Sequence, residues 1–549
     1  MTSSRFPGFV PAEDRRARPI LWSDAVLVVL VGAYILGAVA RVPFHGDESG
    51  LMALSRTAAS RFSGEIHRSD RAQREAIATG VVTPSLIGWA FDIAGVASAD
   101  IPGFWNWGSE VPASQTRFDL NRELGNVPSP AVLTIARVPS TIGFFLSTVV
   151  VLWLAFRLTA SRLAAYSSVL IYATTPAILV NGARAMQEGA MLLLTSLVAA
   201  AGVALMDVSS KATGRRWWLV AGFVGFGLIE GLALAAKHNA ALTLIAVNLA
   251  LLLERVVFGS GRDRVRWMGL GTRAVFLGSS SAVCGAVFLA VTPLWYSTSG
   301  VVACLSLAAI GFLLAWESPP AGRARPNRIL SLVLLGGLAL AWSVSALRQP
   351  VAITLEVRTR LMRSQMESYG WMTSRLERGF FLINELFLDK AQYGEEAEWV
   401  AYPVIAAEIR AFEASAFQGR PTGWAPAVVG LLLSIGGAWR VQVRERTAAG
   451  LLVTVWLALP ALLLWMSNPL PWQRYYIGLY PPLAILMGGG VLAVEQAARH
   501  HRARPAQERL PLPQRENSAA RVVLELPGLS WGISDSSGSA AQPIGRTEL

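Results

Sequence analysis

The sequence of 549 residues is dominated by apolar side chains: 53% are hydrophobic, only 15% are charged, and the mean hydropathy is +0.44. A soluble domain could not bury that much apolar surface, so the composition excludes a soluble protein and indicates a polytopic membrane protein. The net charge of +12 is dispersed through loops, which disfavours nucleic acid as a partner. Both cysteines, Cys284 and Cys304, fall inside apolar runs and are interpreted as small core residues.

The chain contains twelve apolar runs, most of them close to the ~20 residues that a helix needs to cross the hydrocarbon core. They predict an all-α polytopic membrane protein with about twelve transmembrane helices, in a domain that covers residues 22–495. Residues 1–21 are expected to form a cytoplasmic N-terminus. Residues 496–549 are rich in proline, serine and charged residues and are expected to form a disordered cytoplasmic tail. The runs are 22–41, 131–156, 163–181, 185–206, 217–236, 239–257, 274–293, 299–316, 329–346, 424–439, 448–466 and 475–495.

Basic residues cluster in alternate loops, which predicts that these loops and both termini are cytoplasmic. Among these residues are Arg157, Arg162, Arg273 and Arg440. The expected location is therefore the cell (inner or plasma) membrane. The first run lacks a small-residue cleavage site and is interpreted as an anchor. Two outward segments, 42–130 and 347–423, are large and are expected to carry interfacial helices, including the apolar stretch 77–98.

The first outward segment opens with two adjacent carboxylates, Asp47 and Glu48. Apolar residues then recur at spacings of three and four from Leu51 to Phe62, a pattern typical of a short amphipathic helix in the membrane interface. Acids are common at helix starts, so capping of this helix by Asp47 is one interpretation. A catalytic role is the other, and the two are compatible.

The short outward turns are nearly free of basic residues, and Arg184, Lys237 and Arg474 are the exceptions. Three cations at one mouth of a helix bundle are suited to a phosphate leaving group. The alternative is that each one reaches toward lipid headgroups or pairs with a nearby acid. Glu188, four residues after Arg184, is a candidate second acid or a helical partner of that arginine.

Two histidines, His45 and His238, are candidate supporting residues in the same outward turns. No Cys/His spacing indicates a structural zinc site, and no GxxxxGK[ST] pattern indicates nucleotide binding. No cofactor is predicted with certainty, although a divalent cation held by Glu48 or Glu188 is compatible with the pattern.

These features resemble the C-type membrane glycosyltransferases, in the branch of protein O-mannosyltransferases and lipid A aminoarabinose transferases. The Asp-Glu pair that opens the first outer loop carries the resemblance, together with Arg137 before a span rich in small residues. The turn 183–188, the helix end 231–237 and the segment 472–482 resemble further parts of the family. Two departures are Glu188, where the family usually has Asp, and the segment Asn126-Val-Pro-Ser-Pro130, which replaces the family's usual Pro-Pro segment.

The resemblance implies an inverting glycosyltransferase that moves a hexose or pentose from a polyprenyl-phosphate donor to an acceptor at the outer membrane face. Asp47 would be the general base, and Glu48 would orient the acceptor or hold a cation. The expected partners are the donor, membrane lipid and an acceptor that is a protein, a lipid or a polysaccharide. The cations Arg184, Lys237, Arg474 and Arg137 would bind the donor phosphate, with His45, His238 and Tyr475 in support.

Two other function classes stay open at this point. A transporter or flippase for a lipid or amphiphile also places charges along its substrate path. Carriers often contain inverted repeats with broken helices, and no such repeat is present in this sequence. A non-catalytic subunit of a polymer-assembly complex is the third class.

Overall fold

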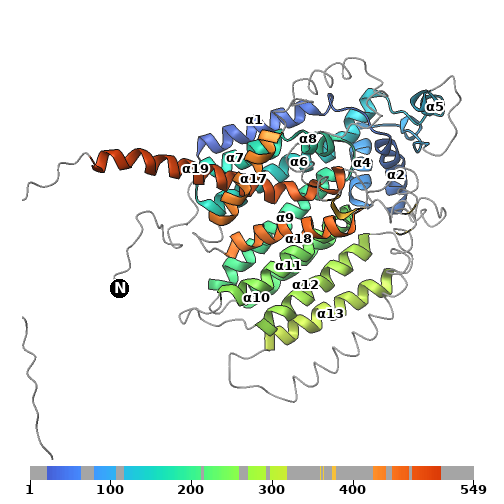
Figure 1. Cartoon of the computed structure of the whole chain (residues 1–549). Coiled ribbons are helices and arrows are strands. Elements are labelled where there is room, and N and C mark those ends of the chain that lie inside the picture. Colours follow the sequence, from blue (N-terminus) through green and yellow to red (C-terminus); the bar gives the residue numbers. More distant parts are fainter. Residues whose placement is uncertain are drawn as a thin grey trace, which may run out of the picture. The chain divides into compact units, whose positions relative to one another are not determined.

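The computed structural model describes residues 21–62, 80–106, 116–211, 216–258, 270–291, 297–317, 424–440, 448–468 and 473–508, and isolated positions between 359 and 382. Every regular element in these residues is a helix, so the predicted all-α fold is confirmed (Figure 1). Two compact units divide the chain, Met1–Gln496 and Ala497–Leu549, and the arrangement given below is that of the first.

Six of the described helices are long and apolar enough to cross a membrane, by length and composition, and a bent pair supplies a seventh span. Four shorter apolar helices coincide with four other predicted runs, and the run 329–346 lies outside the described residues. The long helices are α6 (Pro130–Thr159), α9 (Glu188–Lys211), α10 (Arg216–Ala236), α12 (Leu270–Val291), α18 (Ala448–Ser467) and α19 (Tyr480–Glu508). The others are α1 (Trp22–Ala38), α11 (Ala240–Phe258), α13 (Ser297–Glu317), α17 (Trp424–Trp439) and the bent pair α7 (Arg162–Thr174) and α8 (Pro176–Ala183).

Helix α9 lies at the centre of the first unit, in contact with α6, α10, α11 and α18. On one side α6 continues the packing to α1 and α7, and on the other α10 continues it to α12 and α13 (Figure 1). The contact between α6 and α9 is close because Gly143 faces the backbone of Gly189, and a Cβ on Gly189 would collide with Ser140. This close approach fixes the first turn of α9, which begins at Glu188.

The predicted run 163–181 is a broken span: α7 and α8 meet at an angle of 65°. The break lies at Thr175, the residue before Pro176. Proline cannot donate the backbone hydrogen bond that would continue α7, and it disfavours helical geometry in the residue before it. As a result α8 turns away from α7 and leads the chain toward Arg184.

The described part of the first outward segment forms three short helices: α2 (Gly46–Phe62), α4 (Val82–Ala94) and α5 (Arg117–Glu123), with a 3-10 turn η3 (Ser98–Asp100). A second apolar cluster joins α2, α4 and α5 to the start of α6. Trp89 and Ile93, on the outward face of α4, are 54% and 89% exposed. This face fits the expected interfacial helix within the apolar stretch 77–98.

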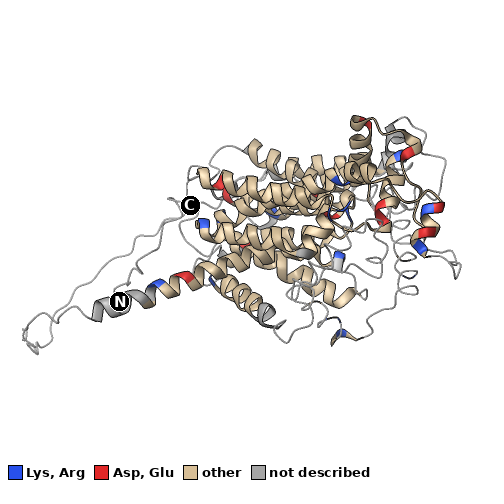
Figure 2. Cartoon of the chain, turned by 90° about the horizontal axis from the view of Figure 1, so that it is seen from above, with Lys and Arg blue, Asp and Glu red and all other residues tan. Residues whose placement is uncertain are grey.

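Charged residues gather toward the helix ends, and the middle parts of the long helices are mostly uncharged (Figure 2). At the end that the sequence predicts to be cytoplasmic, side-chain contacts join neighbouring helices. Each of these arginines thus contacts a polar or charged side chain of another helix. The contacts are Arg157 with Asp207, Arg162 with Asp24, Arg273 with Glu254, and Arg440 with Gln496.

Candidate active site

The candidate site begins at the first turn of α2, where Glu48 rather than Asp47 makes the capping contact. The carboxylate of Glu48 accepts the backbone N–H of His45 at 2.9 Å, the reciprocal half of a capping box. Nδ1 of His45 accepts the backbone N–H of Asp47 at 3.1 Å and so caps the same turn. The Asp47 carboxylate is therefore directed to another partner.

Glu48 is completely buried, and both of its carboxylate oxygens are bound within the chain. Nε and Nη2 of Arg137 each donate to it at 2.8 Å, and the backbone N–H of Ala185 donates at 2.7 Å. Burial by itself would raise the pKa of Glu48, but the adjacent Arg137 charge outweighs burial and holds that pKa below its usual value. Glu48 is thus an ionised anchor inside the protein.

Arg137, only 2% exposed, uses its remaining donors on the chain that links α1 to α2. It donates to the backbone carbonyls of Val39, Val42 and Pro43 at 2.9, 2.7 and 3.2 Å. Arg184 also lies buried here and donates to the Pro43 carbonyl at 3.2 Å. The structure therefore places these two predicted phosphate-binding arginines beneath the Asp-Glu pair, where they fix the loop that carries it.

Asp47 forms an ion pair with Arg474, which comes from the 3-10 turn η8 (Gln473–Tyr475) before α19. Its side chain stays 30% exposed, unlike that of Glu48. Burial raises the pKa of Asp47, but the adjacent charge of Arg474, aided by that of Lys237, outweighs it and lowers that pKa to about 2. In turn, Asp47 raises the pKa of Arg474. The sequence segments that supply this pair are more than 400 residues apart.

Lys237, at the outer end of α10, forms a second ion pair with Glu188 at the start of α9. The ring of Tyr475 is close to both cations: its centre is 5.9 Å from Nζ of Lys237 and 6.0 Å from the Arg474 guanidinium carbon. Lys237 acts electrostatically on Asp47, and Glu188 on Arg474, so the two ion pairs form one charged group. Two residues of the pairs, Glu188 and Lys237, are buried.

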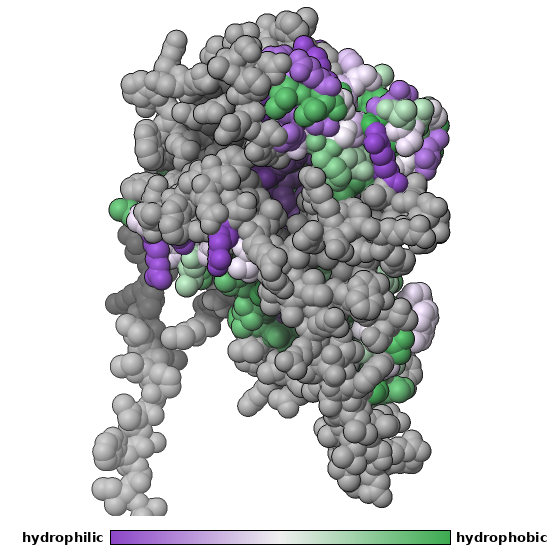
Figure 3. All heavy atoms as spheres, turned by 90° about the vertical axis from the view of Figure 1, so that its right-hand side faces the viewer, coloured by the Kyte–Doolittle hydropathy of each residue, from purple (hydrophilic) through white to green (hydrophobic). Residues whose placement is uncertain are grey.

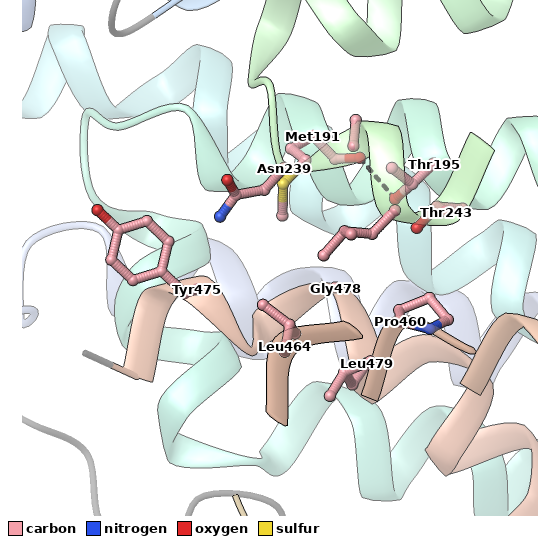
Figure 4. A pocket seen from close by; sticks show the side chains of 11 residues that line it. Met191, Thr195, Asn239, Thr243, Pro460, Leu464, Tyr475, Gly478 and Leu479 are labelled. Atoms are coloured by element: carbon pink, nitrogen blue, oxygen red, sulfur yellow. Dashed lines mark hydrogen bonds between the residues drawn. The ribbon is translucent and has the colours of Figure 1, made fainter. Parts of the chain in front are cut away.

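A small, mostly apolar pocket adjoins this charged group (Figure 4). Met191 and Thr195 of α9 line one wall, and Leu464 of α18 and Leu479 of η9 (Ile477–Leu479) line another. Tyr475 belongs both to the pocket lining and to the charged group. Figure 3 faces the end of the molecule that carries α2, α4 and α5, and hydrophilic side chains are visible there in a recess.

Gly80 is a site residue that the sequence analysis missed. Its φ of +88° is in the left-handed region, and a Cβ there would collide with the carbonyl oxygens of Ala235 and Ala236. The next residue, Val81, donates its backbone N–H to Ala235 at 2.8 Å. The chain entering α4 therefore packs on the end of α10, immediately before Lys237. An isolated glycine at the start of an apolar stretch was the only sequence signal.

We expect Gly80→Ala to destabilise the protein by about 3 kcal/mol, because it adds backbone strain and overpacks the end of α10. Gly95 is the matched control, since it has a φ of +67° but open space around its Cβ position. Gly95→Ala should lower the free energy of unfolding only through backbone strain, by about 1 kcal/mol. Unfolding of both variants in detergent tests this difference, and equal losses would contradict the contact with α10.

The remaining predicted residues lie in different surroundings. The ring of His238 packs edge-on against Phe288 of α12, with the ring centres 5.8 Å apart. Within the described residues, no group of three or more His, Cys, Asp or Glu side chains is arranged to hold a metal ion. Part of the second outward segment contacts the outer end of α18, where Nη1 of Arg378 donates to the Met466 carbonyl at 3.0 Å.

Comparison with known proteins adds a family match. Residues 115–294 match the model of the family "Dolichyl-phosphate-mannose-protein mannosyltransferase". The predicted resemblance is confirmed. The matched segment runs from the residue before Thr116, the cap of α5, to beyond the end of α12, and it includes Arg137, Arg184, Glu188 and Lys237.

Solved structures of an oligosaccharyltransferase from the archaeon Archaeoglobus fulgidus are also similar to this chain. One is the enzyme AglB in complex with an inhibitory peptide and a dolichol-phosphate, at 12% identity and a TM-score of 0.46, covering 88% of this chain and 52% of that one. Another is a complex with Zn and sulfate, at 12% identity and a TM-score of 0.44, covering 88% and 50%. The chain spans about half the length of these structures. No curated protein matches it.

Proposed function

We propose that the protein transfers a sugar from a polyprenyl-phosphate donor to an acceptor at the outer membrane face, with inversion at the anomeric carbon. The observation that carries this proposal is the pair of linked ion pairs, Asp47–Arg474 and Glu188–Lys237, at the mouth of an apolar pocket. A lipid-phosphate sugar has the matching parts: an apolar chain, an anionic phosphate and a sugar.

The charges favour a phosphate at this place. Three carboxylates and four Lys or Arg side chains make up the described group, so these seven side chains together carry one net positive charge. The group consists of Asp47, Glu48 and Glu188 with Arg137, Arg184, Lys237 and Arg474. Arg137 and Arg184 are bound to backbone and to Glu48, so Lys237 and Arg474 are the cations that we assign to the phosphate.

In the proposed reaction the acceptor hydroxyl oxygen attacks C1 of the donor sugar while Asp47 removes its proton. The bond between C1 and the phosphate oxygen breaks, and its electron pair leaves with polyprenyl phosphate. The phosphate gains negative charge in this step, and fixed cations placed where charge develops are effective catalysts. A single displacement from the face opposite the phosphate gives inversion.

A carboxylate with a pKa of about 2 is a weak base, so the pairing of Asp47 with Arg474 describes the protein before the donor binds. A donor phosphate that draws the guanidinium toward itself would weaken the hold on Asp47 and raise its pKa. The donor would thereby prepare the base for the acceptor. We assign Glu48 the role of holding the α2 turn that presents Asp47, since its own oxygens are bound by Arg137 and Ala185.

Arg474→Gln tests this arrangement. We expect a ~10²–10³-fold slower transfer because a phosphate partner is lost. In addition, the acid limb of the kcat/KM profile should move to higher pH. Without the Arg474 charge, burial raises the pKa of Asp47, so the base becomes protonated at a higher pH than in the wild type. Profiles between about pH 3 and 8 should show this limb in Arg474→Gln and not in the wild type, whose Asp47 pKa of about 2 lies below that range.

Arg474→Lys is the control, because it keeps the charge and should keep the acid limb close to that of the wild type. Coincident acid limbs for the wild type and Arg474→Gln would show that Arg474 does not set the pKa of Asp47. The same pair bears on stability. A lowered pKa stabilises the folded state fully above the unfolded value of 3.8, and this contribution is lost as the pH falls toward 2.

A further inference from the structure

One oxygen of the buried carboxylate Glu188 is not used by the mechanism above. Oε1 is bound by Nζ of Lys237, whereas Oε2 is buried and accepts no hydrogen bond from any residue that the structure describes. A buried carboxylate oxygen without a donor destabilises the protein, because it has lost its hydrogen bonds to water without replacement. A bound ligand that brings a hydrogen-bond donor to Oε2 would remove this cost.

The place of Glu188 on α9 indicates which ligand group comes near it. Glu188, Met191 and Thr195 are spaced by three and four residues, so they lie on one face of the helix. Met191 and Thr195 line the apolar pocket, and Glu188 is at the outer end of the same face. With the phosphate at Lys237, whose Nζ binds Oε1 of Glu188, the sugar attached to that phosphate lies next to Glu188.

Lys237 also limits which part of the donor can lie near Glu188. Its ammonium group binds Glu188, and the same group is assigned to the donor phosphate. The phosphate oxygen is attached to C1 of the sugar, and the hydroxyl on the adjacent carbon is the 2-hydroxyl. On the basis of the proposed function, we propose that Oε2 of Glu188 accepts a hydrogen bond from the 2-hydroxyl of the donor sugar. Glu188 is then a specificity-determining residue that selects sugars with a donor group at C2.

This assignment has a kinetic consequence. Hydrogen bonds to the 2-hydroxyl strengthen as positive charge develops at the anomeric centre. A site built to bind a hydroxyl also rejects an analogue that lacks it, because the buried partner is then left without a donor. We therefore expect discrimination against a 2-deoxy donor both in binding and in turnover, and we expect it to depend on the charge of Glu188.

The test compares a polyprenyl-phosphate sugar with its 2-deoxy analogue, on the full-length protein in lipid nanodiscs. The Kd of each donor, measured without acceptor, should differ by about 10- to 100-fold in the wild type. Glu188→Gln replaces a charged acceptor by a neutral one of the same shape and should reduce this ratio severalfold. The ratio of kcat/KM values should change in the same direction, and comparing ratios cancels the intrinsic reactivity of the 2-deoxy sugar.

Ser196→Ala is the matched control. Ser196 also lies on α9, with a buried hydroxyl that has no partner among the described residues, but it is about two helical turns further from the outer end than Glu188. The ratio of the two donor Kd values for Ser196→Ala should equal the ratio for the wild type. Equal affinity of the wild type for both donors would overturn the proposal without any variant, as would a ratio unchanged in Glu188→Gln. If the wild type binds neither donor, the proposed function itself is wrong.

Discussion

Replacing Asp47 by asparagine is expected to slow sugar transfer by about a thousandfold, within the range of ~10²–10⁴ that a general base contributes. The amide cannot take the proton of the acceptor hydroxyl, although it has the same shape. The fold should be little affected, because the α2 turn is capped by His45 and Glu48 and not by the Asp47 carboxylate. Initial rates with a labelled polyprenyl-phosphate sugar, in purified protein of matched thermal stability, measure the effect.

Asp92→Asn is the control for this variant. Asp92 is an exposed acid on α4, so its loss removes one negative charge from the same outward segment without touching the site. We expect wild-type rates from it. Transfer by Asp47→Asn at a rate close to that of the wild type would exclude Asp47 as the base and leave it only its ion pair with Arg474.

The second large effect is expected on stability, at the buried pair of Arg137 and Glu48. Arg137→Leu should destabilise the protein by about 4 kcal/mol, because it leaves a completely buried carboxylate without its cation. It also removes the three hydrogen bonds to the backbone between α1 and α2. Adding Glu48→Leu to this variant should restore part of the loss, since the buried charge disappears with its partner. Equilibrium unfolding in detergent measures both.

Arg122→Ala provides the comparison for that pair. Arg122 forms an ion pair with Asp119 at 3.7 Å on the surface of α5, and both side chains are largely exposed. Such pairs contribute about 0–1 kcal/mol. A similar small loss for Arg137→Leu would mean that the Arg137–Glu48 pair does not hold the loop that carries Asp47.

The helices were predictable because a transmembrane helix needs a long apolar run, and eleven of the twelve predicted runs coincide with helices of the structure. The break between α7 and α8 was not predicted, since the run 163–181 contains no charged residue that would interrupt a span. Pro176 was the available signal. The helix α2 was predicted from its spacing of apolar residues, and the described side chains of Leu51 and Leu54 are buried as that pattern requires.

For the candidate site, the sequence identified residue types but not their pairings. The outward cations Lys237 and Arg474 do come together with Asp47 and Glu188, as their shared position at helix ends suggested. Arg137 was expected at the phosphate, yet it binds a carboxylate 89 residues earlier in the chain. Such a contact depends on how the start of α2 packs on α6, and no local pattern contains that information. Likewise, the role of Gly80 depends on the position of the end of α10.

The carrier alternative differs from the proposed enzyme in one chemical respect. A transporter moves its lipid or amphiphile intact, whereas a transferase breaks the bond between the sugar and the phosphate. The charged group at the pocket mouth would serve binding in both cases. What separates them is whether Asp47, held at a turn and 30% exposed, removes a proton from an acceptor.

The most direct test of the central claim therefore follows the donor phosphate. Purified protein in liposomes would receive a panel of polyprenyl-phosphate sugars, labelled in both sugar and lipid, together with membranes of the source cell as acceptors. The account predicts one polyprenyl phosphate released for each sugar transferred by the wild type, and almost none by Asp47→Asn. Movement of an intact labelled donor across the bilayer, without release of polyprenyl phosphate from any donor, would contradict it.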